Sequence, residues 1–368
     1  MTATAHQRLY AVGFDDLDDE VAIDRLPIKG RFPEWLSGAL LRTRPAKYDL
    51  DRQTISHWFD GLAMLHRFGF ADAQVSYTNR FLRSDAFKRA KETGRLTAGG
   101  FATDPCASLF QRVVAIFSPE RPDNCNVSVN ALAHQAVALP ETRMPICFDA
   151  ETLETLGHYD ISPDVGGRVS TAHPHHDAER QRQFSYVIDF GRVSQYRLFA
   201  VDDEDGKQSV IAKQPVDRPA YMHSIGMSDH YLVLAEFPLV VNPLSFLLRN
   251  EPFIRNYRWR PERGSRIHVF DKDDGRRVTT AEGEPLFVFH HVNAYEVGGE
   301  LLVDVVAYPD ASIIDQLYLA RLCTWPACAR PSRSTGHLYS HATSSVFKAQ
   351  PIGRQWNGFR MPASNCHA

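Results

Sequence analysis

The chain has 368 residues, of which 43% are hydrophobic and 23% charged, which is typical of a globular protein with a large core. Its formal net charge of −3 excludes the strongly basic surface that recruits nucleic acid. The six cysteines form no Cys-x-x-Cys pair, so neither a zinc site nor a disulfide framework is indicated. The 16 histidines are many for a chain of this length, and their surroundings decide what they do.

No segment of the sequence has the pattern of a signal peptide or a membrane span. The first ten residues lack an apolar core. The longest apolar stretch, residues 237–248, is interrupted by Asn242, Pro243 and Ser245, and it is shorter than the roughly 20 residues that span a bilayer. We therefore expect a cytoplasmic protein, with peripheral attachment to the inner membrane face as the open alternative.

Short alternating runs dominate the chain and predict β-strands. Such runs lie at residues 75–81, 185–190, 231–236 and 301–306. Turn signals stand between the runs: Asp60-Gly61, Gly166-Gly167, Asp205-Gly206, Asp274-Gly275 and Gly298-Gly299. Long helical periodicity is rare, so the pattern indicates an all-β fold. It does not choose among a sandwich, a barrel and a propeller.

The composition changes abruptly near the C-terminal end of the sequence. The last of the 44 acidic residues is Asp315, although about 7 more would be expected at the same density. Residues 323–336 also show neither strand nor helix periodicity. We expect a domain over residues 1–322 and an aberrant or disordered tail over 323–368. Translation in a shifted frame after about Leu322 is favoured over a genuine basic tail.

Three histidines stand in distinctive local sequences. His173 lies in Thr-Ala-His-Pro-His-His-Asp, His223 in Tyr-Met-His-Ser-Ile-Gly, and His290 in Phe-His-His-Val-Asn-Ala-Tyr-Glu. Separations of 50 and 67 residues cannot place ligands on one helix. They suit one ligand from each of several repeated sheet units. Each motif is weak when it is taken alone.

Together with other segments, the motifs resemble the carotenoid cleavage oxygenase family. The resemblance covers roughly residues 20–320 and includes Gly-Arg-Phe-Pro-Glu-Trp-Leu at 30–36, His-Trp-Phe-Asp-Gly at 57–61 and Asp-Ala-Glu-Thr-Leu at 149–153. It implies a seven-bladed β-propeller with Fe(II) on its axis, held by four histidines, and short helical segments over the metal face. It also implies that dioxygen is inserted across one double bond of an apolar polyene, which gives two carbonyl products.

The resemblance assigns roles to particular residues. His173, His223 and His290 match iron ligands. His290 is preferred over its neighbour His291 because the family's ligand stands three residues before the asparagine, here Asn293. Glu141 matches a carboxylate that hydrogen-bonds a ligand imidazole. No side chain outside the metal centre is expected to act as an acid or a base.

The sequence departs from the family pattern after residue 320. The family's fourth histidine and two further glutamates are not matched, and His337, His341 and His367 stand in unrelated surroundings. We therefore expect an incomplete propeller that lacks its C-terminal blades, weak iron binding and impaired activity. An inactive, truncated propeller fragment is the alternative from a different class.

Two apolar segments suit the entry of a lipid-soluble substrate. The first has Leu109, Phe110, Val113 and Phe117 on one helical stripe. The second has Leu239, Leu244, Phe246 and Leu247, and four arginines follow it at positions 249–260. Basic residues beside an apolar segment favour contact with a membrane surface.

Two other reactions occur within the same family. Members that cleave stilbenoids use a lysine and a tyrosine for the phenol, but no lysine occurs here between Lys91 and Lys207, which favours a carotenoid substrate. Isomerase chemistry is a further alternative. We expect a small apolar polyene and O2 as partners, and neither nucleic acid nor a defined protein partner.

Overall fold

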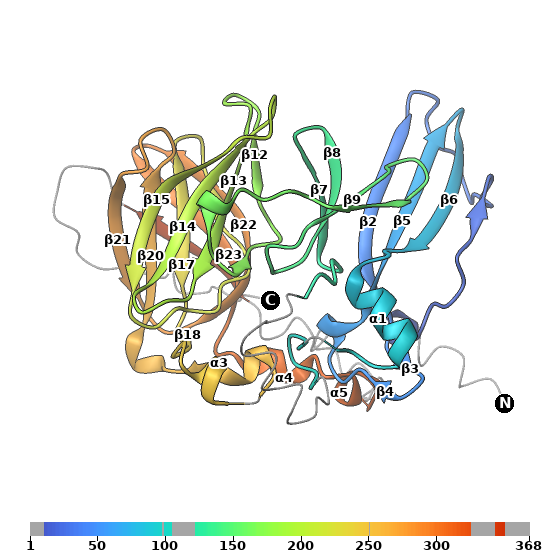
Figure 1. The fold of residues 1–368 in the computed structure, drawn as a ribbon. Coiled ribbons are helices and arrows are strands. Elements are labelled where there is room, and N and C mark those ends of the chain that lie inside the picture. Colours follow the sequence, from blue (N-terminus) through green and yellow to red (C-terminus); the bar gives the residue numbers. More distant parts are fainter. Residues whose placement is uncertain (1–10, 98, 105–121, 250, 325–342, 350–368) are drawn as a thin grey trace, which may run out of the picture. The chain divides into compact units, whose positions relative to one another are not determined.

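The computed structural model of the chain describes residues 11–97, 99–104, 122–249, 251–324 and 343–349. Most of them lie in antiparallel strands or in the turns between strands (Figure 1). The chain divides into two compact units. The first comprises residues 1–161, 250–255 and 316–328, and the second comprises 162–249, 256–315 and 329–368.

The first unit contains two four-stranded sheets, and every strand pair in them is antiparallel. One sheet has the order β1 (Ala22–Ile23), β6 (Gln74–Phe81), β5 (Leu62–Ala71), β2 (Gly38–Lys47). The other has the order β10 (Thr155–His158), β9 (Ile146–Phe148), β8 (Gln135–Leu139), β7 (Ser128–Leu132). The smaller elements are β3 (Asp49–Leu50), β4 (Gln53–Thr54), α1 (Asp85–Thr93), α5 (Leu319–Thr324) and 3-10 helices at Ala11–Phe14 and Trp58–Asp60.

The second unit contains three larger sheets. A five-stranded sheet holds β11 (Val169–Ser170), β12 (His175–Asp177), β13 (Arg182–Asp189), β14 (Ser194–Asp202) and β15 (Gln208–Val216). A four-stranded sheet has the order β16 (Gly226–Met227), β17 (Tyr231–Glu236), β20 (Ser265–Asp271), β21 (Arg277–Gly283). A three-stranded sheet has the order β22 (Phe287–Val297), β23 (Glu300–Tyr308), β24 (Thr343–Ala349).

Short elements complete the second unit and its borders. They are β18 (Leu239–Val240), β19 (Arg258–Trp259), α3 (Ser245–Leu248), α4 (Ser312–Gln316) and 3-10 helices at Pro163–Val165, Phe253–Asn256 and Pro261–Arg263. Short helical segments were expected from the family resemblance. Their placement over a metal face stays a prediction.

Alternating apolar residues form the cores between neighbouring sheets. In the second unit, Val233 on β17, Val269 on β20 and Val303 on β23 belong to one buried cluster, so two successive sheets pack face to face. In the first unit, Leu65 on β5 and Ile146 on β9 join the two four-stranded sheets in the same way. Stacked meander sheets of this kind are the blades of a propeller. The described residues form five sheets of three to five strands, and the expected seven-bladed ring stays a prediction.

The strand β24 corrects one expectation about the tail. Residues after 322 were expected to have little regular structure, but Thr343–Ala349 pairs antiparallel with β23 from Ala307 to Leu301. The expectation is wrong for these seven residues. A run such as Ser344-Ser345-Val346-Phe347 can complete a ladder without acidic residues, because backbone groups form its hydrogen bonds. Residues 325–342 and 350–368, with His337, His341 and His367, lie outside the described residues, and the boundary at 322 stays a prediction.

Gly275 makes a turn whose geometry only glycine fits. It lies between β20 and β21 with φ +71°, and a Cβ there would come within 2.1 Å of the Ile211 carbonyl oxygen. We expect Gly275→Ala to lower the free energy of unfolding by more than about 2 kcal/mol, because left-handed strain and the clash add. Gly298→Ala is the control: its φ is +59° but no atom lies within 4 Å, so only about 1 kcal/mol is expected. Urea unfolding of both variants measures the difference, and equal losses would contradict the steric argument.

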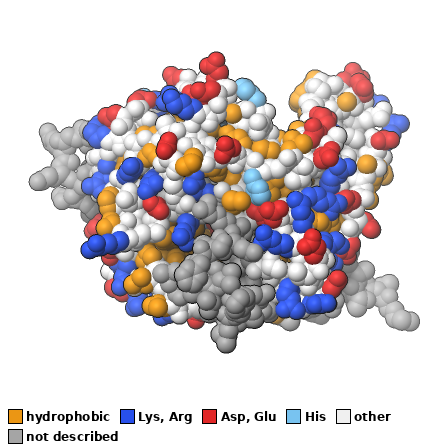
Figure 2. Space-filling model, viewed as in Figure 1, with side chains coloured by type: hydrophobic (Ala, Val, Ile, Leu, Met, Phe, Trp, Pro, Cys, Tyr) orange, Lys and Arg blue, Asp and Glu red, His pale blue; other side chains and the backbone are white. Residues whose placement is uncertain are grey.

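The surface mixes both signs of charge. On the face shown in Figure 2, Lys and Arg side chains are interspersed with Asp and Glu, in keeping with the net charge of −3. Within the described ranges, no helix combines the length and the apolar character that crossing a membrane requires.

Candidate metal centre

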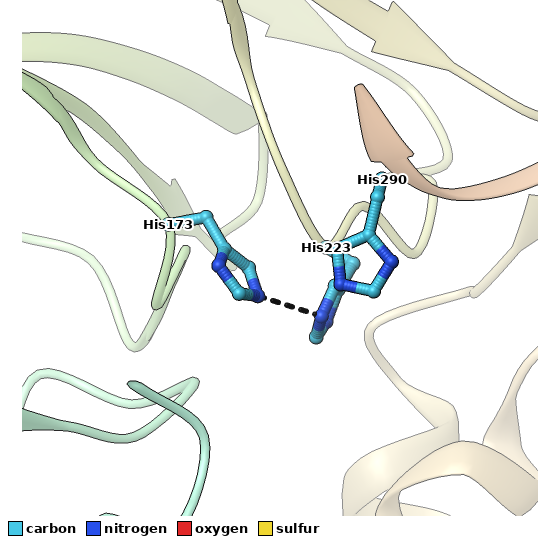
Figure 3. A group of neighbouring side chains, drawn as sticks. All are labelled: His173, His223 and His290. Atoms are coloured by element: carbon cyan, nitrogen blue, oxygen red, sulfur yellow. Dashed lines mark hydrogen bonds between the residues drawn. The ribbon is translucent and has the colours of Figure 1, made fainter. Parts of the chain in front are cut away.

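Three histidines of the second unit turn their rings toward one another (Figure 3). His173 lies in the loop before β12, His223 in the loop before β16, and His290 within β22. The strands that follow His173 and His223 and the strand that contains His290 belong to three different sheets of this unit. His290 is brought in by a β-bulge: the pairing of β22 with β23 shifts between Val288 and His291. In a regular strand, side chains alternate between the two faces of the sheet, and a bulge changes the direction of the side chain at that position.

The three imidazoles are close enough to share one small ion. One ring nitrogen from each lies within 4.8 Å of the others. The Nε2 atoms of His173 and His223 are 2.9 Å apart. Bonds of about 2.1 Å from a metal to imidazole, the length known for zinc, hold two ligand nitrogens at right angles about 3 Å apart. The observed separation therefore fits two adjacent ligands of one divalent metal.

The environment of the rings keeps two of them neutral. Burial, together with the neighbouring His223, His290 and His175, lowers the pKa of His173 to about 3. His290 is the most exposed of the three residues, but desolvation of its ring and the nearby His223 still lower its pKa to about 4. Both imidazoles are thus unprotonated at neutral pH, which is the form that binds a metal. His223 is 6% exposed, and Phe289 packs edge-on against its ring with 5.5 Å between centroids.

Neighbouring histidines of the same motifs lie outside this cluster. His175 Nε2 donates to the Ile225 carbonyl at 2.8 Å, and His176 Nε2 pairs with Asp203 Oδ2 at 2.6 Å. His291 Nδ1 lies 2.8 Å from Ser224 Oγ. His290 therefore lies in the cluster and His291 does not, which is the arrangement that the preference for His290 in the sequence predicts.

A second group of possible ligands lies in the first unit but does not suit a cation. Asp85, Asp123 and His158 bring ligand atoms within 4.8 Å of one another. Both Asp123 oxygens already accept backbone N–H groups, from Asp85 and Ala86, at 2.8 Å. These N–H groups belong to the first turn of α1, where the helix dipole favours negative charge and disfavours a cation. Asp123 is therefore a helix cap, to which the His158 Nε2 adds a contact of 3.1 Å.

Comparison with known families decides what kind of protein carries the three histidines. The model of the retinal pigment epithelial membrane protein family matches residues 14–350. This is nearly the whole chain. The chain belongs to this family of carotenoid oxygenases. The match also extends beyond the expected limit of residue 320 and includes β24.

Curated members of the carotenoid oxygenase family are about one third identical to the chain. A β,β-carotene 15,15′-dioxygenase of Gallus gallus is 32% identical over 324 residues, covering 80% of this chain and 61% of the relative. A carotenoid isomerooxygenase of Galleria mellonella is 33% identical over 316 residues, covering 79% and 60%. The chain thus spans about three fifths of the length of these relatives.

Solved structures of the same family share the fold. A mutant of the Synechocystis apocarotenoid oxygenase matches with a TM-score of 0.72 and 19% identity, covering 93% of this chain and 70% of that chain. The cobalt-substituted Synechocystis enzyme matches with a TM-score of 0.71 and 21% identity, covering 91% and 68%. The all-β, propeller-like fold expected from the sequence is confirmed at this level.

The remaining residues that the sequence singled out lie elsewhere. Glu141 lies half-buried in the first unit, in the turn after β8, and its hydrogen bond to an imidazole stays a prediction. Leu109, Phe110, Val113 and Phe117 lie outside the described residues. In the second apolar segment, Leu244 is 58% exposed, but Leu239 is only 6% exposed. Leu239 on β18 pairs with Trp259 on β19 and is buried, so it is not part of an exposed surface, and its place at a substrate entrance stays a prediction. Phe246 packs against Phe190 and Tyr257, and the side chain of Leu247 is not described.

Proposed function

We propose that the chain is a non-haem Fe(II) dioxygenase that cleaves one C=C bond of a carotenoid or apocarotenoid. The observation that carries the proposal is the convergence of His173, His223 and His290 in a member of the carotenoid oxygenase family. The relatives named above act on carotenoids according to their names. The stilbenoid alternative has no comparable support from them.

In this proposal, the three imidazoles hold the metal. Imidazole is a suitable ligand for iron as well as for zinc, copper and nickel. His173 and His290 are neutral at physiological pH because of their lowered pKa values, so protons do not compete with the metal for these two rings. Neutral ligands also leave the charge of the ion uncancelled. The bound iron would supply the activation of dioxygen.

The protein's own part in the reaction is to bind and orient. The double bond is replaced by two carbonyl groups, and both oxygen atoms of O2 enter the products. No proton has to be gained or lost overall, so an acid or base is not required. The aromatic ring of Phe289 beside His223 provides an apolar, water-excluding neighbour that suits a polyene.

The test is product formation by the purified full chain. The protein is loaded with Fe2+ and incubated with a β-apocarotenal, β-carotene or a hydroxylated stilbene under 18O2. We expect two carbonyl products from a carotenoid, each carrying one labelled oxygen, and no cleavage of the stilbene. Chromatography with mass spectrometry measures both. Cleavage of the stilbene alone would change the substrate class. Iron binding without any product would leave the inactive fragment as the better account, and lack of iron binding would reject the metal centre.

A further inference from the structure

The loop that carries His223 is buried although it forms no regular ladder. Residues 221–225 are all buried and lie before β16. Buried carbonyls in such a segment need partners from side chains. Three of them accept hydrogen bonds from side chains on the five-stranded sheet or directly after its strand β11. Tyr186 hydroxyl donates to Met222 O at 2.6 Å, Thr171 Oγ1 to His223 O at 2.6 Å, and His175 Nε2 to Ile225 O at 2.8 Å.

Thr171 connects two of the histidine backbones directly. Its Oγ1 accepts the N–H of His173 at 2.9 Å and donates to the carbonyl oxygen of His223 at 2.6 Å. The side chain is buried, with 3% of Thr171 exposed. The one hydroxyl therefore donates to the segment that carries His223 and accepts from the segment that carries His173. The bridge therefore joins the backbone segments that carry His173 and His223.

Ser224 performs the corresponding task for His290. Its Oγ donates to the Phe289 carbonyl at 2.7 Å and accepts the His291 N–H at 2.9 Å. These two groups flank His290 in the bulge of β22, where the ladder to β23 is interrupted. A bulge leaves backbone groups without ladder partners, and the serine, which lies outside the strand, supplies hydrogen-bond partners for two of them. Because Ser224 follows His223 in the chain, it ties His290 to the His223 loop.

The third contact of Ser224 agrees with this assignment. A hydroxyl has one proton to donate and two lone pairs to accept. Because the Ser224 hydroxyl donates its proton in the hydrogen bond to Phe289 O, Oγ must accept from Nδ1–H of His291. The two atoms, Oγ and Nδ1, lie 2.8 Å apart. The tautomer of His291 is thereby set, and all three bonds of the hydroxyl are used.

We propose that Thr171 and Ser224 are positioning residues that set the spacing of His173, His223 and His290. The proposal rests on the proposed function in that the three rings are taken as metal ligands. Groups that fix the orientation of ligands typically change metal affinity about 10–100-fold when they are removed. Here the hydroxyls act on the backbones that carry the rings rather than on the rings themselves.

The variants separate a positioning role from a general cost of losing a buried hydroxyl. Thr171→Val and Ser224→Ala remove the two hydroxyls with little change in shape, and Thr171→Ser restores the first. Ser265→Ala is the matched control: Ser265 is 1% exposed, and its Oγ donates to a backbone carbonyl, Glu284 O, at 2.8 Å. Urea unfolding establishes that each full-length variant is folded.

The first readout is the binding of Co2+, used alone as a spectroscopic probe. We expect T171V and S224A to bind Co2+ about 10–100-fold more weakly and to change the position and intensity of its visible bands. T171S and S265A should bind within about 3-fold of the wild type, with an unchanged spectrum. Wild-type affinity and spectrum in both T171V and S224A would overturn the proposal, as would an equal loss in S265A.

The second readout needs no metal and keeps the two proposals apart. Crystal structures of the metal-free wild type, T171V, S224A and S265A compare the positions of the three rings. We expect displaced rings in T171V and S224A only. If the wild type binds no Co2+, the metal centre of the proposed function fails, and these structures alone decide the positioning role. Unmoved rings in both hydroxyl variants would reject it.

Discussion

Replacing His223 with alanine should abolish stable metal binding and carotenoid cleavage. His223 is the most buried of the three clustered histidines, and its Nε2 lies 2.9 Å from that of His173. Loss of a group that only supports a ligand costs about 10–100-fold in affinity, so loss of the ligand should cost more than about 100-fold. Titration with Co2+, iron content after loading and the formation of carbonyl products measure the effect.

The matched control is another histidine from the same motifs. His176 pairs with Asp203 and has 47% of its side chain exposed, so His176→Ala removes a ring of the same chemistry outside the cluster. This variant should keep the metal affinity and activity of the wild type. Similar losses in both variants, or a fully loaded and active His223→Ala, would show that the three histidines do not form the metal centre.

Strand positions could be predicted from the sequence because alternation and turn residues are local signals. Residues 231–236 were predicted as a strand and form β17 with the same limits, and the run at 301–306 lies within β23. Gly206 and Gly275 mark hairpin turns with φ +69° and +71°, the backbone region that glycine favours. The pairing of β24 with β23 joins residues about 40 positions apart, and no local pattern near residue 343 announces it.

The candidate ligands could be found from their sequence motifs. The hydrogen bonds and the bulge that hold these residues in place could not be predicted in this way. The offset to Asn293, a property of the local sequence, selected His290 rather than His291, and His290 is the one that lies in the cluster. The bridges through Thr171 and Ser224 join segments 52 to 67 residues apart, and the bulge at His290 appears only in the pairing of β22 with β23. Both hydroxyl residues lie inside the histidine motifs: Thr171 is two residues before His173, and Ser224 directly follows His223. Only the fold shows that each is buried and bonded to another histidine's segment.

The buried ion pair of Asp177 and Lys272 is the other feature with a large expected effect. Lys272 Nζ lies 2.6 Å from Asp177 Oδ2, and these side chains are 2% and 7% exposed. Arg180 Nη1 contacts the same oxygen at 3.0 Å, and the N–H groups of Glu179 and Arg180 donate to Oδ1. Burial alone would raise the pKa of Asp177, but the bonds from Lys272 and Arg180 outweigh it and lower the pKa to about 2.

Asp177→Asn should therefore lower the free energy of unfolding by about 3–5 kcal/mol at pH 7, because it leaves the ammonium of Lys272 buried without a carboxylate. The pH dependence has a definite sign. A folded-state pKa of about 2, below the ordinary 3.8, means that the unfolded chain binds the proton more readily. The stabilisation is complete above about pH 5, and roughly 2 kcal/mol of it is lost as the pH falls through 4 toward 2.

Urea unfolding of the wild type and of Asp177→Asn between pH 7 and pH 3 tests both statements. The difference in the free energy of unfolding between the two proteins should shrink as the pH falls. Asp217→Asn is the control, because Asp217 accepts from Arg263 at 3.1 Å but has 67% of its side chain exposed. A pair exposed in this way contributes about 0–1 kcal/mol, since water and salt screen it. If Asp177→Asn were as stable as Asp217→Asn, or if its deficit were the same at pH 7 and pH 3, the buried carboxylate would not hold Lys272 in the way that the 2.6 Å contact indicates.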